Sequence, residues 1–324
     1  MKAGIIKAAG KSPVYGDFNE PVAGEGQELI TVSASALSQF SKSRSSGSHY
    51  SSSAKFPSVA GADGVGRTAT GRRVYVALPE APYGALAEKS LVSSKHCVAV
   101  SDGVDDVTAA AIANPGMSAW AALVERAHLQ PGESVLINGA TGTAGKLAVQ
   151  LARYLGAGKV IGTGRNENEL AELLSGGADT VIPFALGPSL PRGAKHYEQR
   201  LIAEFARGID IVIDYLWGES AKTVIVAIAK AVEDARPVRF VHVGEASREE
   251  SMELSGAALR SSAIQLMGSG IKSVPFPKLL DAVKNILDAV LPARLQIQKN
   301  TVPLSAIEEY WSAPGKPRVV VTIP

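Results

Sequence analysis

A glycine-rich turn in the middle of the chain constrains the fold more than any other feature of this sequence. Residues 135–157 read VLINGATGTAGKLAVQLARYLGA, so a short β-branched run leads directly into a turn rich in Gly and Ala. Apolar residues then recur at helical spacing, at Ala144, Leu147, Ala148, Leu151 and Leu155. The segment is therefore predicted to pass from a strand through a tight turn into a helix.

This A-x-G-x-x-G turn is expected to bind the paired phosphates of a dinucleotide. Gly142 lets the backbone approach a pyrophosphate, and Gly145 lets the helix pack closely. The helix N-terminus adds unpaired N–H groups and a partial positive charge. A Walker A loop is excluded, because Leu147 stands where Ser or Thr would hold magnesium. The candidate cofactor contacts in the turn are Ala140, Thr141, Gly142, Thr143, Ala144 and Gly145.

Strands and helices alternate on the C-terminal side of the turn. Strands are expected over 134–137, 159–163, 180–184, 209–216, 238–244 and 263–269. Between them, helices are expected after the turn, from Asn166, and over 196–206 and 219–232. This order predicts an α/β fold with a doubly wound parallel Rossmann sheet. Val243 and Gly244, at the end of the fifth strand, are further candidate cofactor contacts, since strand C-termini face the cofactor.

The end of the second strand favours NADPH over NADH. NAD-binding folds place Asp or Glu about 20 residues past the turn, where it binds the ribose 2′-hydroxyl. Here Gly164-Arg165-Asn166 follows Thr163, with no carboxylate before Glu167. The Arg165 guanidinium can pair with a 2′-phosphate, while Asn166 can also cap the next helix.

The two ends of the chain differ from its centre. Residues 1–128 contain short apolar runs broken by Gly, Pro and Ser, at 28–37, 72–78 and 96–100, which predict a mostly β domain. The Ser-rich stretch 38–57 is expected to be a solvated loop. After about 270, we expect a helix over 275–290, a short helix over 302–311 and a closing strand over 317–324. That strand is very apolar and is expected to rejoin the N-terminal domain. The predicted domains are therefore 1–128 completed by 270–324, and 129–269 as the dinucleotide-binding domain.

Composition excludes several classes of function. The 33 Lys and Arg residues nearly balance 31 acidic ones, so no nucleic-acid or anionic membrane surface is expected. No window approaches the roughly 18 apolar residues of a membrane span. The single Cys97 excludes an intramolecular disulfide and a Cys-rich zinc lobe. We expect a cytoplasmic protein.

Several segments together resemble the medium-chain dehydrogenase/reductase superfamily, in its zinc-independent quinone oxidoreductase-like branch. They read FPSVAGADGVG (56–66), GRRVYV (71–76), YGALAE (83–88), DDVTAAAIANPGMSAWAAL (105–123), PGESVLINGATGTAG (131–145) and GKPRVVVTIP (315–324). The resemblance implies a GroES-like catalytic domain built from both chain ends. It also implies a homodimer formed through an edge strand, here 263–269.

The resemblance also identifies candidate catalytic residues and argues against zinc. The positions of two zinc ligands in metal-dependent relatives look like Ser38 and Ala62, which cannot supply those ligands, so no metal is expected. Ser38, Tyr50 and Ser118 match positions that lie near the nicotinamide or line the quinone pocket in relatives. These residues would serve a hydride transfer to quinones or other α,β-unsaturated carbonyls.

Three alternatives compete with this function. A short-chain dehydrogenase is excluded, because none of the eight tyrosines has Lys four residues on. An enoyl-thioester reductase on the same scaffold would use basic residues such as Lys42, Arg44 and Lys55 to bind the substrate tail. A non-catalytic NADPH-binding redox sensor is the third.

Overall fold

The computed structural model describes residues 1–47, 55–187, 190–314 and 316–324. The chain forms two compact units. One consists of Met1–Pro115 together with Leu280–Pro324 and is called the split unit below; the other, Gly116–Leu279, is called the central unit. Both chain ends therefore belong to the same unit.

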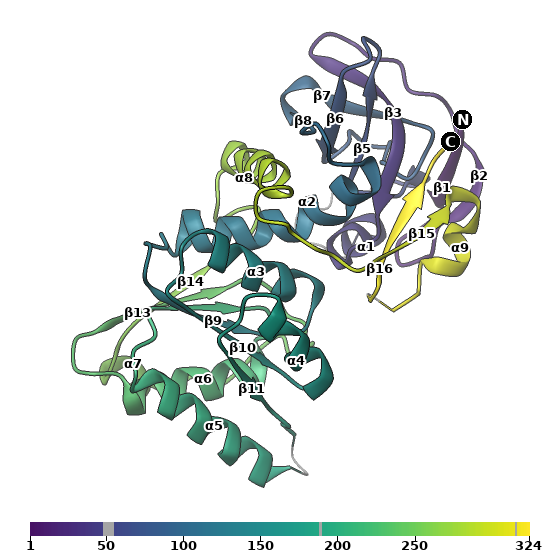
Figure 1. The fold of residues 1–324 in the computed structure, drawn as a ribbon. Coiled ribbons are helices and arrows are strands. Elements are labelled where there is room, and N and C mark those ends of the chain that lie inside the picture. Colours follow the sequence, from purple (N-terminus) through teal and green to yellow (C-terminus); the bar gives the residue numbers. More distant parts are fainter. Residues whose placement is uncertain (48–54, 188–189, 315) are drawn as a thin grey trace. The chain divides into compact units, whose positions relative to one another are not determined.

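The central unit contains a parallel sheet of six strands in the order β11-β10-β9-β12-β13-β14 (Figure 1). Every neighbouring pair is parallel, which confirms the predicted doubly wound fold class. β14 lies at one edge, as expected for residues 263–269. The strands are β9 (Ser134–Asn138), β10 (Lys159–Gly164), β11 (Thr180–Pro183), β12 (Ile211–Asp214), β13 (Pro237–His242) and β14 (Ala263–Gly268).

Helices cover both faces of this sheet (Figure 1). α5 and α6 pack side by side on one face, where strand residues such as Leu136 and Phe240 meet helix residues such as Tyr197 and Ile225. α3 contacts β9 and β10, and α4 contacts β10 and β11. The helices are α3 (Thr143–Tyr154), α4 (Glu167–Ser175), α5 (Pro191–Phe205), α6 (Gly218–Ala231) and α7 (Gly256–Arg260). α5 begins five residues before the predicted start, with Pro191 in its first turn, where a proline is tolerated.

The split unit is built mainly from antiparallel sheets. A three-stranded sheet has the order β2-β1-β4, and a larger one the order β15-β16-β3-β5-β6-β8, with β7 also paired to β3. The strands are β1 (Lys2–Ile6), β2 (Val14–Asp17), β3 (Gln27–Ala36), β4 (Ser58–Val59), β5 (Asp63–Thr68), β6 (Arg73–Ala77), β7 (Lys89–Ser93), β8 (Cys97–Ala99), β15 (Lys299–Pro303) and β16 (Arg318–Thr322).

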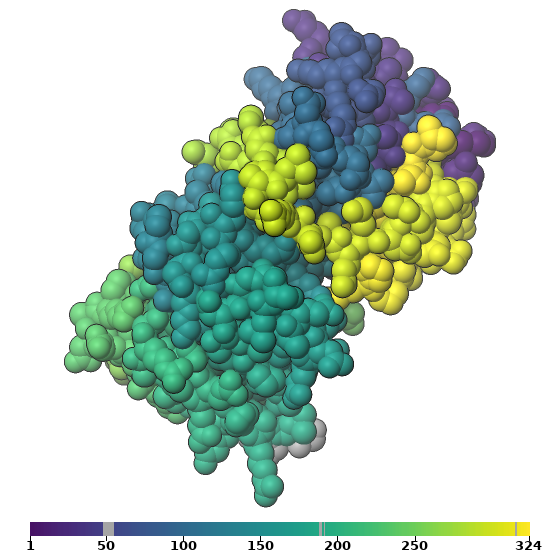
Figure 2. All heavy atoms as spheres, in the orientation of Figure 1, coloured from purple at the N-terminus to yellow at the C-terminus, as the bar shows by residue number. Residues whose placement is uncertain are grey.

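The closing strand rejoins the N-terminal domain, as the sequence predicts. β16 pairs antiparallel with β3, and Val320 and Val321 are buried. Figure 2 shows atoms of the C-terminal segment, in yellow, against those of the N-terminal strands, in purple. The apolar character of 317–324 is thus explained by its place inside a sheet.

Two predictions for the split unit are wrong. Part of the Ser-rich stretch is a helix, α1 (Gln39–Ser46), rather than a loop. Ser38 accepts a hydrogen bond from the Ser41 amide at its start, and left-handed Gly47 ends it. Its buried residue is Ser41, so no apolar periodicity reveals the helix.

The predicted helix over 302–311 begins only at α9 (Ile307–Tyr310), after the 3-10 turn η3 (Leu304–Ala306). Residues up to Pro303 belong to β15, which pairs parallel with β16. Sheet pairing therefore overrides the local helical pattern there. The 3-10 turn η1 (Ser94–His96) precedes β8.

The expectation that no segment is long and apolar enough to span a membrane is wrong for one helix. α2 (Asp106–Trp120) continues into the π-helical segment η2 (Ala121–Arg126), and together they are long and apolar enough to cross a membrane by length and composition. In its most apolar window, 61% of the residues are buried inside the protein, as in a core helix. α8 (Phe276–Ala289) is the last long helix of the chain.

Candidate functional site

The glycine-rich turn has the steric properties that a phosphate-binding turn needs. Gly142 is the N-cap of α3, with extended backbone (φ −70°, ψ 164°), and as a glycine it has no side chain that could cap the helix. A Cβ atom at Gly142 would meet only the Gly139 carbonyl oxygen, at 3.5 Å. The space above Gly142 is therefore open to a ligand.

In contrast to Gly142, Gly145 has no room for a side chain. A Cβ atom there would lie 2.7 Å from the Cα atom of Ala140 and closer still to the Gly139 carbonyl oxygen. Both obstacles are backbone atoms that cannot rotate away. The first turn of α3 can thus approach the strand end only because residue 145 is glycine.

The turn is held against the end of β10. The Ala140 amide donates to the Thr163 carbonyl oxygen at 2.8 Å. A Cβ atom at Gly164 would lie 2.6 Å from Thr141 Cγ2, so Gly164 and Thr141 touch. The structure therefore brings together the predicted residues of the turn and the end of the second strand.

Arg165 lies just past this contact and is exposed. Across the described ranges, it forms no ion pair. Asn166 caps α4 by accepting a hydrogen bond from the Glu169 amide at 3.1 Å, as predicted. The cap and an exposed guanidinium coexist, so Arg165 is available to an anionic ligand.

A buried polar network lies at the ends of three strands, and sequence reasoning did not find it. Asn138, at the end of β9, is fully buried. Its side-chain oxygen accepts hydrogen bonds from the hydroxyls of Thr163, Tyr197 and Ser220, at 2.7, 3.0 and 3.0 Å. Its amide donates to Asp214 Oδ1 at 2.8 Å. Each strand end that borders the turn is thereby fixed by one side chain.

Asp214 extends this network to His242. His242 Nδ1 lies 3.0 Å from Asp214 Oδ2, and the Trp217 amide donates to the same carboxylate oxygen at 3.0 Å. The His242 ring also packs on Trp217, with 4.4 Å between ring centroids. His242 is therefore a partnered side chain at the strand ends.

Ser118 lies near a tyrosine that sequence reasoning did not single out. Burial raises the pKa of the Tyr215 phenol, and the neighbouring Ser118 hydroxyl counteracts this effect. The Tyr215 hydroxyl itself is buried and forms no hydrogen bond with the described residues. A Cβ atom at Gly244 would lie 3.6 Å from the Tyr215 carbonyl oxygen. Ser118, Tyr215, Val243 and Gly244 thus belong to one part of the central unit.

The other predicted catalytic positions belong to the split unit or are not described. Ser38 Oγ accepts from the Ser41 amide at 2.9 Å, and Ser41 Oγ accepts from the Ala62 amide at 3.1 Å. This chain of two hydrogen bonds links Ser38 and Ala62, the two positions that the resemblance matches to zinc ligands. Tyr50 lies outside the described residues.

The donor set does not fit zinc. Neither the methyl group of Ala62 nor the Ser38 hydroxyl, which is engaged with the backbone, matches the thiolate and imidazole that such a site uses. Among the described residues, no group of three or more His, Cys, Asp or Glu side chains could hold a metal ion. By contrast, the open space at Gly142 and the N-terminus of α3, whose N-cap is a glycine, do fit a dinucleotide phosphate.

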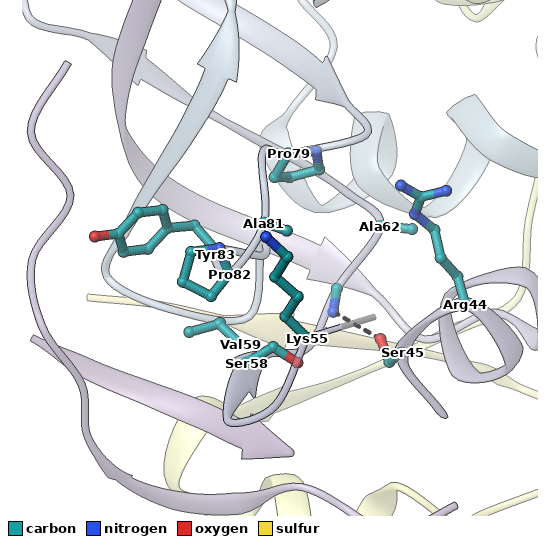
Figure 3. A pocket seen from close by; sticks show the side chains of 11 residues that line it. Arg44, Ser45, Lys55, Ser58, Val59, Ala62, Pro79, Ala81, Pro82 and Tyr83 are labelled. Atoms are coloured by element: carbon teal, nitrogen blue, oxygen red, sulfur yellow. Dashed lines mark hydrogen bonds between the residues drawn. The ribbon is translucent and has the colours of Figure 1, made fainter. Parts of the chain in front are cut away.

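A pocket of about 60 Å³ lies beside Ala62 (Figure 3). Its walls come from α1, the segment around β4 and the loop after β6. Two of the three basic residues considered for an enoyl-thioester tail, Arg44 and Lys55, line it. The third, Lys42, instead lies with its ammonium 3.4 Å from the Ala313 carbonyl oxygen.

A buried ionic cluster completes the split unit, again without a signal in the sequence. Asp63 accepts a hydrogen bond from the Tyr75 hydroxyl at 3.1 Å and is attracted by the charge of buried Arg318. Burial raises the pKa of Asp63 to about 6, and the Arg318 charge and the Tyr75 bond counteract this shift.

Comparisons with known sequences agree with this architecture. Residues 144–285 match the family described as "Zinc-binding dehydrogenase". The chain is 25% identical to the "Probable NADPH-dependent quinone reductase tdiC" of Emericella nidulans, over 92% of both proteins. It is 30% identical to the quinone oxidoreductase of Pongo abelii, over 62% of this chain and 60% of that protein.

A shorter match and a solved structure complete the comparison. The trans-enoyl reductase pgmF of Aspergillus terreus is 31% identical over 102 residues, which is 32% of this chain and 28% of that protein. The quinone oxidoreductase from Thermus thermophilus superimposes with a TM-score of 0.79 at 24% identity, covering 99% of this chain and all of that one. This structural likeness shows the fold.

Proposed function

Since the chain belongs to the medium-chain dehydrogenase/reductase superfamily, in its quinone oxidoreductase-like branch, we propose that it is an NADPH-dependent reductase of quinones or other α,β-unsaturated carbonyls that works without zinc. One observation carries the proposal. The turn before α3 leaves open space at Gly142, the glycine N-cap of the helix, and lets the helix pack closely at Gly145. That combination suits the phosphates of a dinucleotide.

Cofactor binding is assigned to the turn and to the strand ends around it. Backbone amides of residues 140–145 would bind the pyrophosphate, helped by the dipole of α3. Arg165 would pair with the 2′-phosphate, and Gly164 and Asn166 would shape the surface around it. Val243 and Gly244 would line the nicotinamide end. The Asn138 network keeps these strand ends in register while the ligand binds.

When bound, NADPH supplies the hydride that the β-carbon of an enone or a quinone ring accepts. The chain's own residues must polarise the carbonyl and exclude water. We assign the polarising role to the hydroxyls of Ser38, Tyr50 and Ser118. The buried Tyr215 phenol beside Ser118 has a raised pKa and would therefore stay neutral, so it would add no charge next to that hydroxyl.

The domain assignment follows from this proposal. Residues 1–128 with 270–324 would form the catalytic domain, and 129–269 the dinucleotide-binding domain. We also propose a homodimer formed through β14, which lies at a sheet edge and exposes Leu266. Sedimentation equilibrium measures this directly, and a monomer at micromolar concentration would contradict it.

Steady-state oxidation of NADPH tests the reaction. With 1,4-benzoquinone and 9,10-phenanthrenequinone as acceptors, we expect turnover above an enzyme-free blank, and far slower turnover with NADH. Elemental analysis of the purified protein should find no stoichiometric zinc, and one zinc per chain would contradict the branch assignment. No affinity for either dinucleotide would end the proposal.

Two other functions remain to be distinguished from quinone reduction. Reduction of an enoyl thioester is favoured by Arg44 and Lys55 in the pocket beside Ala62 and by the match to a trans-enoyl reductase. A redox sensor would bind NADPH tightly yet oxidise it with none of these acceptors. Assays with crotonyl thioesters and with quinones, together with a titration of NADPH binding, therefore distinguish the three functions.

A further inference from the structure

The pocket beside Ala62 has a one-sided charge. Its charged lining residues are Arg44, near the end of α1, and Lys55, just before β4. None of the 11 residues that line it in the described part of the chain is acidic. Figure 3 shows the two cationic side chains reaching the pocket from these different segments. Glu80, next in sequence to two lining residues, has its carboxylate engaged 2.5 Å from the Gln27 side-chain amide.

The Arg44 charge is partly removed from water. Arg44 is half-buried, and desolvation lowers the pKa of its guanidinium. An anion that approaches a half-buried cation interacts with it more strongly than in bulk water, because the surroundings screen charge less, and a charge-assisted hydrogen bond adds to this attraction. Arg44 therefore favours a negatively charged occupant over a neutral one.

The remaining lining adds hydrogen-bonding groups and rigidity. Ser45 and Ser58 contribute hydroxyls, and the Ser45 oxygen already accepts from the Gly61 amide at 3.3 Å. Pro79 and Pro82 form another part of the wall and have no N–H to offer. The pocket volume of about 60 Å³ is several times the roughly 10–15 Å³ that holds one water molecule. A carboxylate or a phosphate fits.

The pocket is also connected to the proposed catalytic hydroxyl. Ala62 lines it, and Ala62 is linked to Ser38 through the two hydrogen bonds of Ser41. The pocket and the proposed catalytic hydroxyl therefore lie in the same part of the split unit.

We propose that this pocket binds an anionic substituent of the electron acceptor, a carboxylate or a phosphate, and so selects acceptors that carry one. The inference rests on the proposed reductase function and specifies its substrate class. The phosphate could belong to a coenzyme A thioester and the carboxylate to a small quinone acid. The carboxylate and the phosphate both present anionic oxygen atoms to Arg44 and Lys55.

The test compares pairs of acceptors that differ only in the remote charge. One pair is 3-(1,4-benzoquinon-2-yl)propionate and its methyl amide, in which two methylene groups separate the charge from the ring. The other is crotonyl-4′-phosphopantetheine, which carries the phosphate of the coenzyme A arm without its adenosine, and crotonyl-pantetheine, which lacks that phosphate. The readout is the ratio of kcat/KM within each pair, which cancels any general loss of activity in a variant.

Arg44→Gln, Lys55→Gln and the double variant are compared with Lys95→Gln, which removes an exposed charge of the same unit away from the pocket. The wild type should prefer the anionic member of at least one pair, through KM. Lys55→Gln, at an exposed residue, should reduce that preference about threefold, and Arg44→Gln, at a half-buried one, about tenfold. Lys95→Gln should leave it unchanged.

The outcomes separate this inference from the proposed function. Equal kcat/KM for both members of both pairs overturns the inference while leaving the reductase intact, as does an equal effect of Lys95→Gln. A preference only in the quinone pair identifies a carboxylate, and one only in the thioester pair a phosphate. If no acceptor is reduced, the reductase proposal fails. Calorimetric titration of inorganic pyrophosphate into NADP⁺-saturated protein then decides: binding lost in the double variant supports the pocket, and no binding overturns it.

Discussion

The two glycines of the turn offer a sharp pair of substitutions, because one is closed and the other open. In Gly145→Ala the new methyl group would lie 2.7 Å from the Ala140 Cα atom and closer still to the Gly139 oxygen. Neither atom can move without shifting α3 or the end of β9. Overpacking of this kind costs about 2–3 kcal/mol, which for a unit of this size lowers Tm by about 5–10 °C.

Gly142→Ala is the matched control for stability and the direct test of binding. Its backbone (φ −70°, ψ 164°) suits any residue, and the added methyl group would contact only the Gly139 oxygen, at 3.5 Å. The free energy of unfolding should therefore stay within about 1 kcal/mol of the wild type. The methyl group would nevertheless occupy the space above the turn, so the Kd for NADPH should rise about tenfold, or about 1.4 kcal/mol.

Differential scanning calorimetry and titration of NADPH fluorescence measure the two effects separately. Gly145→Ala should lose stability and binding together, whereas Gly142→Ala should lose binding alone. Wild-type affinity in Gly142→Ala would refute the assignment of the turn as the phosphate site. Equal destabilisation by both substitutions would refute the steric argument.

Three further predictions address charge and burial. Arg165→Ala should weaken NADPH binding at least tenfold (about 1.4 kcal/mol) more than NADH binding, and equal losses in a fluorescence titration would contradict the phosphate role. Asn138→Ala should cost about 3–4 kcal/mol in urea unfolding, because it leaves several buried groups without a partner, against about 1 kcal/mol for Ser220→Ala; similar costs would contradict the central place of Asn138. The raised pKa of Asp63, about 6, means that the folded protein binds this proton more tightly than the unfolded chain, so the stability contributed by Asp63 falls as pH rises from about 4 to about 6. Between pH 4 and pH 7 the difference in unfolding free energy should therefore shift by up to ~3 kcal/mol in favour of Asp63→Asn, and a pH-independent difference would show that the carboxyl titrates normally.

Prediction from the sequence succeeded where the signal was local. The strand, turn and helix around residue 140 were recognisable because glycine sterics, β-branched runs and helical periodicity act within a few residues. It failed at α1, whose buried residue is a serine, and at β15, whose strand depends on pairing with β16. In both cases the stabilising contact comes from a distant part of the chain.

The features that bear on function divide in the same way, into those set by neighbouring residues and those set by residues far apart in the sequence. Its sequence alone determined a doubly wound dinucleotide fold, a turn with one open and one closed glycine, and an arginine where a carboxylate would repel a 2′-phosphate, since these depend on neighbouring residues. Only the tertiary structure decided that Asn138 meets Ser220, 82 residues away, that Asp63 lies near Arg318, and that Arg44 and Lys55 line one pocket. Such contacts are set by strand order and register, which bring remote side chains within hydrogen-bonding distance and leave no periodic trace along the chain.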